Sequence, residues 1–181
     1  MVNTSKLKLT NLQQEILRVL FKRVGKPLNQ RQIANILEVS QAAIMKALPS
    51  LEKLDFIKLK KDKETKRWSV ELNTGNNKVM QEKRVDNLKQ IYESGLADFL
   101  EKEFVGTTII LFGSYSRGDD NINSDIDIAV RMVHRDWNNL EIELDLIGEL
   151  VSALGKAGDV DVAFLNGASP LLSFEVACTG I

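Results

Sequence analysis

The stretch that decides the fold reads Gly-Ser-Tyr-Ser-Arg-Gly at residues 113–118 and, six residues later, Ser-Asp-Ile-Asp-Ile at residues 124–128. The run before it, Thr107 to Phe112, is β-branched and apolar, which predicts a strand that ends at the first glycine. The run from Asp125 to Val130 alternates acidic and apolar residues, which predicts a second strand with two different faces. The glycine and serine between two strands therefore mark a sharp turn beside an acidic sheet face.

The two acids of the second strand suggest a metal site. Residues i and i+2 of a strand project to the same face, so Asp125 and Asp127 are expected side by side. Close carboxylates repel each other and are costly to bury unpaired, and a divalent cation relieves both problems. A third strand, predicted over Asp159 to Leu165, carries two further acids of one parity, Asp159 and Asp161. Either fits as the third carboxylate, and Asp161 is preferred because it lies inside the strand.

This set of acids predicts a reaction type. Mg²⁺ prefers hard oxygen ligands and keeps positions open for water and substrate phosphates. Three carboxylates on neighbouring strands allow two metal ions and a general base, which suits in-line phosphoryl or nucleotidyl displacement. We therefore expect Asp125, Asp127 and Asp161 to be both the metal ligands and the catalytic residues.

The glycine–serine turn predicts where the phosphates bind. Gly113 and Ser114 stand at a strand end before a short helix, where free backbone N–H groups and the serine hydroxyl can bind triphosphate oxygens. Arg117 lies one turn later and is expected to neutralise phosphate charge, although it also fits an ordinary surface arginine. Ser124 is assigned to the same nucleotide-binding segment, with bracing of the loop before Asp125 as its other interpretation.

The combined motif of residues 113–118 and 124–128 resembles the minimal nucleotidyltransferases of the DNA polymerase β superfamily. The resemblance covers about Phe99 to the C-terminus and implies a small mixed sheet flanked by helices. It implies that Asp125 and Asp127 bind both metals and that Asp161 is the third carboxylate. It also implies that Gly113 and Ser114 hold the triphosphate, with ATP as the favoured nucleotide. In the family, the stretch resembling residues 169–180 usually continues for some residues, whereas this chain stops at Ile181. That departure leaves the acceptor side of the pocket unassigned.

The charge distribution separates this acidic part from a basic one. Residues 1–75 contain 15 Lys and Arg against 7 Asp and Glu, whereas residues 76–181 contain 9 against 18. A basic module suits a polyanion, and an acidic module suits metal ions and, through them, phosphate. Two units with different partners are therefore expected.

The basic part has the pattern of a helix-turn-helix followed by a hairpin. A first helix with an N-cap at Thr10 or Asn11 precedes a helix over Asn29 to Leu37, and Ser40 caps a third helix. Pro49 predicts a kink or a break in that third helix. The stretch from Lys58 to Leu72 has β-like ends and a charged centre, which predicts a basic hairpin, or wing.

Residues 32–44, Gln-Ile-Ala-Asn-Ile-Leu-Glu-Val-Ser-Gln-Ala-Ala-Ile, resemble winged-helix transcription regulators. The resemblance implies side chains that enter the DNA major groove and wing lysines that contact phosphates; these are Gln41, Ala42 and Lys46, and Lys60, Lys61 and Lys63. Winged helices also serve in protein docking and dimerisation, and a lysine-rich hairpin can act only in solubility.

These patterns predict an α+β chain with three parts. The parts are an N-terminal winged helix-turn-helix domain over residues 1–75, a linker helix over 76–98, and a C-terminal nucleotidyltransferase domain with a small mixed sheet over 99–181. A long helix is expected from Val79 to Phe104, with an interruption at Gly95. Helices are also expected over Asn138 to Leu154 and after Ser169-Pro170.

Composition excludes several other classes of protein. Hydrophobic residues make up 44% and charged residues 27%, as in an ordinary globular protein. The first six residues lack the apolar core typical of a signal peptide, and no apolar run is long enough to span a bilayer, so a cytoplasmic location without membrane association is expected. One histidine, His134, and one cysteine, Cys178, make a zinc site improbable, and Cys178 is expected to be a packed, inert thiol. The sequence contains no Gly-x-Ser-x-Gly nucleophile elbow, so nothing in it supports a Ser-His-Asp hydrolase.

The leading hypothesis is an Mg²⁺-dependent nucleotidyltransferase that moves a nucleoside monophosphate from a triphosphate to a protein, nucleic-acid or small-molecule hydroxyl. Its winged helix would bind DNA, and by family resemblance it would be the antitoxin of a helical toxin partner, with homodimerisation as a further option. The alternative is a DNA-binding transcription regulator whose nucleotidyltransferase fold senses nucleotide or mediates assembly. A third interpretation has the winged helix recruit a protein or RNA partner.

Overall fold

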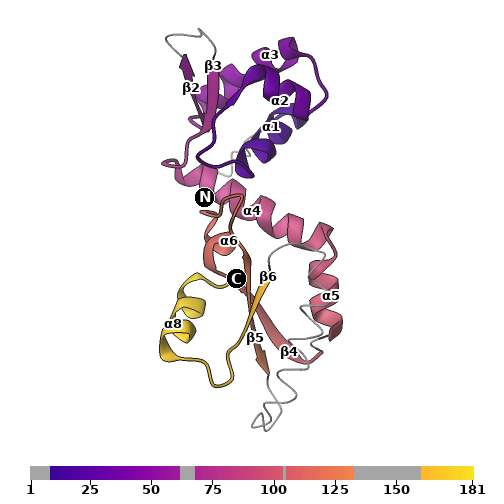
Figure 1. Ribbon diagram of the computed structural model, residues 1–181, viewed down its shortest axis with the longest axis vertical. Coiled ribbons are helices and arrows are strands. Elements are labelled where there is room, and N and C mark those ends of the chain that lie inside the picture. The colour runs from indigo at the N-terminus through magenta and orange to yellow at the C-terminus, as the bar shows by residue number, and fades with distance from the viewer. Residues whose placement is uncertain (1–8, 62–67, 104, 133–159) are drawn as a thin grey trace, which may run out of the picture. The chain divides into compact units, whose positions relative to one another are not determined.

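The computed structural model describes residues 9–61, 68–103, 105–132 and 160–181, and the chain divides into two compact units, Met1–Lys83 and Arg84–Ile181 (Figure 1). The division falls within helix α4 (Asn77–Glu93). The domain limits expected from the sequence, at residues 75 and 98, stay predictions. Each unit has its own sheet and its own core.

Each helix of the first unit begins at a capping residue, of which Thr10 and Ser40 were predicted and Asn29 was not. The helices are α1 (Asn11–Phe21), α2 (Gln30–Ile36) and α3 (Gln41–Lys53). Thr10, Asn29 and Ser40 each accept a hydrogen bond from the backbone N–H three residues later, with N···O distances of 3.3, 2.9 and 3.2 Å. Such caps satisfy a backbone donor that the first turn leaves unpaired. The predicted N-cap alternatives are thereby resolved in favour of Thr10.

Of the two outcomes predicted at Pro49, a kink or a break, the structure excludes the break. Helix α3 continues through Pro49 to Lys53. The buried positions Ile44, Leu48 and Leu51 lie on both sides of the proline and all face the same core. Burial of that face stabilises the helix by an amount that offsets the hydrogen bond lost at proline.

The first unit also contains a three-stranded antiparallel sheet of order β1-β3-β2. Its strands are β1 (Leu28–Asn29), β2 (Ile57–Lys61) and β3 (Trp68–Leu72). Strands β2 and β3 form the predicted hairpin, and residues 62–67 at its tip lie outside the described residues. Strand β1 was not predicted, because two residues are too few to show a strand period.

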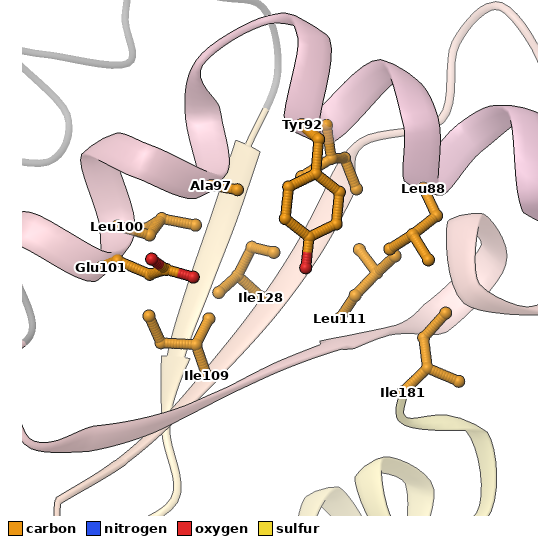
Figure 2. A pocket seen from close by; sticks show the side chains of 10 residues that line it. Leu88, Tyr92, Ala97, Leu100, Glu101, Ile109, Leu111, Ile128 and Ile181 are labelled. Atoms are coloured by element: carbon orange, nitrogen blue, oxygen red, sulfur yellow. The ribbon is translucent and has the colours of Figure 1, made fainter.

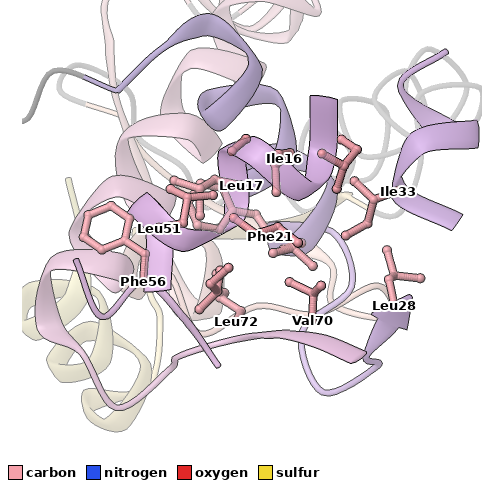
Figure 3. Packing of buried hydrophobic residues seen from close by; sticks show 14 of the residues in the cluster. Ile16, Leu17, Phe21, Leu28, Ile33, Leu51, Phe56, Val70 and Leu72 are labelled. Atoms are coloured by element: carbon pink, nitrogen blue, oxygen red, sulfur yellow. The ribbon is translucent and has the colours of Figure 1, made fainter. Parts of the chain in front are cut away.

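One apolar core closes the first unit. Side chains from all three helices and all three strands meet in it, as Figure 3 shows for Ile16, Ile33, Leu51, Phe56 and Val70. Phe56 and Ile33 are fully buried. Together with the helix-turn-helix and the β2–β3 hairpin, this core gives the unit the winged-helix arrangement that the sequence predicts.

The described elements of the second unit are α5, β4, α6, β5, β6 and α8, together with most of α4. Their bounds are α5 (Leu96–Glu103), β4 (Thr107–Phe112), α6 (Gly113–Arg117), β5 (Ile126–Met132), β6 (Val160–Phe164) and α8 (Pro170–Thr179). Gly95, with φ of +79°, separates α4 from α5 at the predicted interruption. The helix predicted over residues 138–154 lies outside the described residues. Within the described residues, no helix combines the length and hydropathy that crossing a membrane requires.

The sheet of the second unit is mixed, as predicted. Its order is β4-β5-β6, with β4 and β5 antiparallel and β5 and β6 parallel. Side chains of even-numbered β5 and β6 positions, such as Ile128 and Val162, pack with α4 and α5. Odd-numbered positions, such as Ala129 and Ala163, pack with Phe112 and with Val176 of α8. The two faces therefore have separate cores, and the odd positions share the face covered by α8.

Candidate active site

The three predicted acids lie on the α8 face of the sheet. Asp127 and Asp161 are register partners on the parallel strands β5 and β6, so their side chains project from adjacent strands to one face. Asp125 precedes β5 by one residue and shares the parity of Asp127. Ile126 and Ile128 belong to the opposite core, as the alternation predicted. Sheet pairing thus brings together carboxylates that lie 34 positions apart in the sequence.

Asp127 is the electrostatic centre of this group. Burial raises the pKa of Asp127 above its usual value, and the nearby carboxylates of Asp161, Asp125 and Glu175 raise it further. A hydrogen bond from the backbone N–H of Ser114 lowers the pKa, but it does not outweigh the other causes. The site therefore holds more negative charge than its protein surroundings neutralise, which is the condition that a bound cation relieves.

The Gly-Ser turn lies directly against Asp127. Gly113 has φ of +68°, and a Cβ built on it would overlap the Asp127 carboxylate. Only glycine meets both conditions, because other residues rarely adopt this φ and all of them carry a Cβ. The turn therefore approaches the acid as closely as backbone allows.

The backbone N–H groups of Gly113 and Ser114 were expected to be free to bind phosphate, but both donate hydrogen bonds within the protein. The Gly113 N–H donates to Thr179 Oγ1 of α8 at 3.4 Å, and the Ser114 N–H donates to Asp127. The Ser114 hydroxyl has no hydrogen-bond partner among the described residues. In this arrangement the hydroxyl, rather than the two amides, is available to a phosphate.

Arg117 and Ser124 occupy the rim of the site. Arg117 Nε lies 3.1 Å from Asp119 Oδ2, and its Nη1 lies 3.9 Å from Glu175 Oε1. The Ser124 hydroxyl accepts a hydrogen bond from the Asn121 N–H at 3.0 Å and so braces the loop before Asp125. Both are exposed or half-buried, and their role toward nucleotide stays a prediction.

The donor set fits a hard divalent cation. Carboxylate oxygens are the ligands that Mg²⁺ prefers, and the mutual repulsion at Asp127 favours a bound cation. Among residues 9–61, 68–103, 105–132 and 160–181, however, the side chains of Asp, Glu, His and Cys form no group of three or more that could hold a metal ion. Asp159 and His134 lie outside the described residues.

Two further residues at the site, Glu175 and Tyr115, were given no role from the sequence. Glu175 of α8 acts on Asp127 and pairs with Arg117, and its α-helical position gave no metal-binding signal. Tyr115 is half-buried, and burial together with the charges of Asp120 and Asp125 raises the pKa of its hydroxyl. Both are placed by tertiary contacts from outside the Asp-x-Asp strand.

The packed thiol expected at Cys178 is wrong, because Cys178 is exposed. Val176 is the residue of α8 that is buried against the sheet, and Cys178 lies two positions on, which in a helix points away from that face. Leu171 and Phe174 of the same helix are also exposed, at 78% and 69%.

A small apolar pocket lies on the other face of the sheet. It has a volume of about 130 Å³ and is formed by α4, α5 and the strands, with Leu88, Ile109 and Leu111 among its lining residues (Figure 2). Figure 2 also shows the side chains of Tyr92 and Glu101 at this pocket. Because its lining is almost entirely apolar, it does not suit a triphosphate.

The predicted DNA-contacting residues of the first unit are exposed. Gln41, Ala42 and Lys46 are exposed on α3, whose opposite side carries the buried Ile44. Lys60 Nζ lies 2.8 Å from Glu71 Oε2, and Lys61 Nζ lies 5.7 Å from the centre of the Trp68 ring. Lys63 lies outside the described residues.

Comparison with known proteins supports the interpretation of the second unit. Residues 95–181 match the family model described as Polymerase beta, Nucleotidyltransferase, and so form a nucleotidyltransferase domain of that type. The protein adenylyltransferase MntA of Shewanella oneidensis is 36% identical over 94 residues, which is 51% of this chain and 65% of that protein. The chain therefore spans less than two thirds of that relative's length.

Solved structures align with about half of the chain or with most of it. A crystal structure described as the toxin-antitoxin with AMP-PNP is 36% identical, with 49% of this chain and 69% of that chain covered and a TM-score of 0.39. The adhesin competence repressor AdcR of Streptococcus pyogenes is 20% identical, with 86% and 84% covered and a TM-score of 0.42.

Proposed function

We propose that this chain transfers a nucleoside monophosphate from a nucleoside triphosphate, with ATP favoured, to a hydroxyl acceptor. One observation carries the proposal: Asp127 and Asp161 are register partners on adjacent strands and project to one face of the sheet. The Gly113 turn lies against Asp127 on that face. A nucleotidyltransferase domain over residues 95–181 supports it. Similarity to a protein named a protein adenylyltransferase favours AMP as the transferred group.

In this proposal each residue has a defined task. Asp125, Asp127 and Asp161 would hold Mg²⁺, which supplies neutralisation of triphosphate charge and polarisation of the phosphoryl group. The Ser114 hydroxyl donates to a phosphate oxygen, and the missing Cβ of Gly113 lets the turn that carries this hydroxyl lie directly against Asp127. Holding donor and acceptor together removes much of the entropic cost of reaction.

The proposed transfer is a displacement at the α-phosphorus of the triphosphate. The acceptor oxygen forms a bond to that phosphorus while the bond to the bridging oxygen of the leaving group breaks. Pyrophosphate leaves, and the proton of the acceptor hydroxyl passes to the Asp161 carboxylate. We assign the role of general base to Asp161 because its side chain is exposed, whereas that of Asp127 is half-buried.

The first unit would bind DNA through α3 and the hairpin. The exposed face of α3 and the lysines of β2 present positive charge that a phosphate backbone can neutralise. Similarity to a structure described as toxin-antitoxin favours a helical toxin as the protein partner and an antitoxin role for this chain. Both assignments are parts of the proposal.

The test measures nucleotide binding by thermal melting with ATP, GTP, CTP and UTP, each with and without Mg²⁺. A ligand at about 100 times its Kd adds roughly 2.7 kcal/mol, a shift of several degrees for a chain of this size. The shift should require Mg²⁺ and disappear in Asp125→Asn/Asp127→Asn. The control is Asp98→Asn/Glu101→Gln, which removes the same charge from α5 and should keep the shift. No shift with any triphosphate in the folded native protein would contradict the proposal.

A further inference from the structure

The side chain of Asn87 connects helix α4 to α6, the short helix that begins with Gly113 and Ser114. It lies in the part of α4 that belongs to the second unit, and its side chain is only 2% exposed. Its Nδ2 donates to the Tyr115 carbonyl at 3.1 Å and to Asp120 Oδ1 at 2.6 Å. One carboxamide therefore contacts both α6 and the loop that follows it.

The carbonyl that Asn87 contacts lies at the end of α6, where a short helix leaves acceptors without intrahelical partners. The Ser114 carbonyl receives the N–H groups of Gly118 at 2.8 Å and Asp119 at 3.2 Å. The Tyr115 carbonyl receives the Asn87 carboxamide instead. Removing that side chain would leave a part-buried acceptor without this partner, which is costly.

The other end of α6 is held against the acids. Gly113 fits against Asp127 without room for a Cβ, and the Ser114 N–H donates to Asp127. Within α6, the fully buried Ser116 hydroxyl donates to the Gly113 carbonyl at 2.9 Å. The segment is thus internally braced and fixed between Asp127 on one side and Asn87 on the other.

We propose that Asn87 is a positioning residue for the triphosphate, holding α6 and the start of the loop to Asp125 in the geometry that binds nucleotide. The inference rests on the proposed function. Asn87 lies outside residues 113–128 and outside the matched residues 95–181, so no motif of the nucleotidyltransferase domain contains it. It acts through the Tyr115 carbonyl and Asp120, and not by touching the nucleotide.

The first experiment compares Asn87→Ala with a matched control, Asn73→Ala. Asn73 is also a buried asparagine, 5% exposed, whose Nδ2 donates to a backbone carbonyl, that of Asp55, at 3.0 Å. We expect Asn87→Ala to weaken Mg²⁺-ATP binding roughly tenfold, as loss of an orienting partner does at metal sites, and Asn73→Ala to leave it unchanged. Equal affinities in two folded variants would overturn the inference.

A second variant pair keeps the test informative if Asn87→Ala folds poorly. Asn87→Asp sets a carboxylate against Asp120 and should weaken nucleotide binding most. Asn87→Asp/Asp120→Asn restores a carboxamide–carboxylate pair with the donor reversed, and should bind nucleotide more tightly than Asn87→Asp alone. A double variant no better than the single one would contradict the role assigned to this contact.

Hydrogen exchange separates failure of this inference from failure of the proposed function. The amides of Gly118 and Asp119, which bond to the Ser114 carbonyl, should exchange faster in Asn87→Ala than in Asn73→Ala without any nucleotide. If the native protein binds no triphosphate, the proposed function fails and Asn87 has no triphosphate to position. If the native protein binds ATP but neither exchange nor affinity responds to Asn87→Ala, only this inference fails.

Discussion

The two units place their charges differently with respect to their cores. In the first unit, helices and strands together form one apolar core, and lysines such as Lys46 and Lys60 are exposed. In the second unit a half-buried acid, Asp127, stands on the sheet beside two other acids, and the apolar contacts are divided between two smaller clusters. The comparison indicates that the second unit gives up some stability at Asp127.

The largest effect should come from matched leucines in the two cores. Leu51 of the first unit and Leu100 of the second are both almost fully buried, at 0% and 2% exposure. Leu→Ala substitutions in cores cost roughly 2–5 kcal/mol, and we expect Leu51→Ala to lie near the upper end because more buried neighbours surround it. Urea unfolding of both variants, followed by circular dichroism, measures the difference. A larger loss for Leu100→Ala would break the comparison.

Substitution of glycines sharpens the comparison at the site itself. Gly113 and Gly95 both have positive φ, at +68° and +79°, but only Gly113 has an atom where a Cβ would stand. Gly95→Ala should cost about 1 kcal/mol for its backbone conformation. Gly113→Ala should cost more and should also abolish Mg²⁺-dependent nucleotide binding, because the methyl group displaces Asp127. Equal losses of stability, measured by thermal melting, would show that the close approach has no consequence.

The acid at the centre of the site should be destabilising near neutral pH. Because the pKa of Asp127 is higher in the folded state than in the unfolded state, the protonated carboxyl favours folding. This contribution to the free energy of unfolding is fully present below the unfolded-state pKa, and it is lost as the pH rises through the folded-state pKa. Asp127→Asn should therefore raise the Tm of the metal-free protein at pH 7 by an amount of order 1 °C, reduced by solvent screening. The gain should vanish below about pH 4, where a carboxyl is protonated. A lower Tm for the variant at pH 7 would contradict this sign.

The smallest effect on stability is expected on the first unit's surface. Lys60 is 65% exposed and pairs with Glu71 at 2.8 Å, so Lys60→Ala should change stability by less than about 0.5 kcal/mol. If the hairpin contacts DNA, the same variant should reduce the salt slope of duplex binding by about one unit. Fluorescence anisotropy across a salt series measures that slope. An unchanged slope would remove Lys60 from the proposed DNA surface.

Much of the local structure follows from short patterns in the sequence. Thr10 and Ser40 predict helix starts because a capping side chain acts within three residues. The strand at residues 107–112 and the shared face of Asp125 and Asp127 follow from a period of two, which is also local. Pro49 shows the limit, because burial of α3 outweighs a local preference.

The sequence by itself therefore determined where elements begin, which residues share a face, and that a glycine–serine turn precedes an acidic strand. Only the tertiary structure decided which strands are neighbours, and hence that Asp161 lies opposite Asp127. It alone placed Glu175 and Asn87 at the site and left Cys178 exposed. The physical reason is range: capping and alternation act over a few residues, whereas strand pairing and helix packing join residues that are distant in the chain.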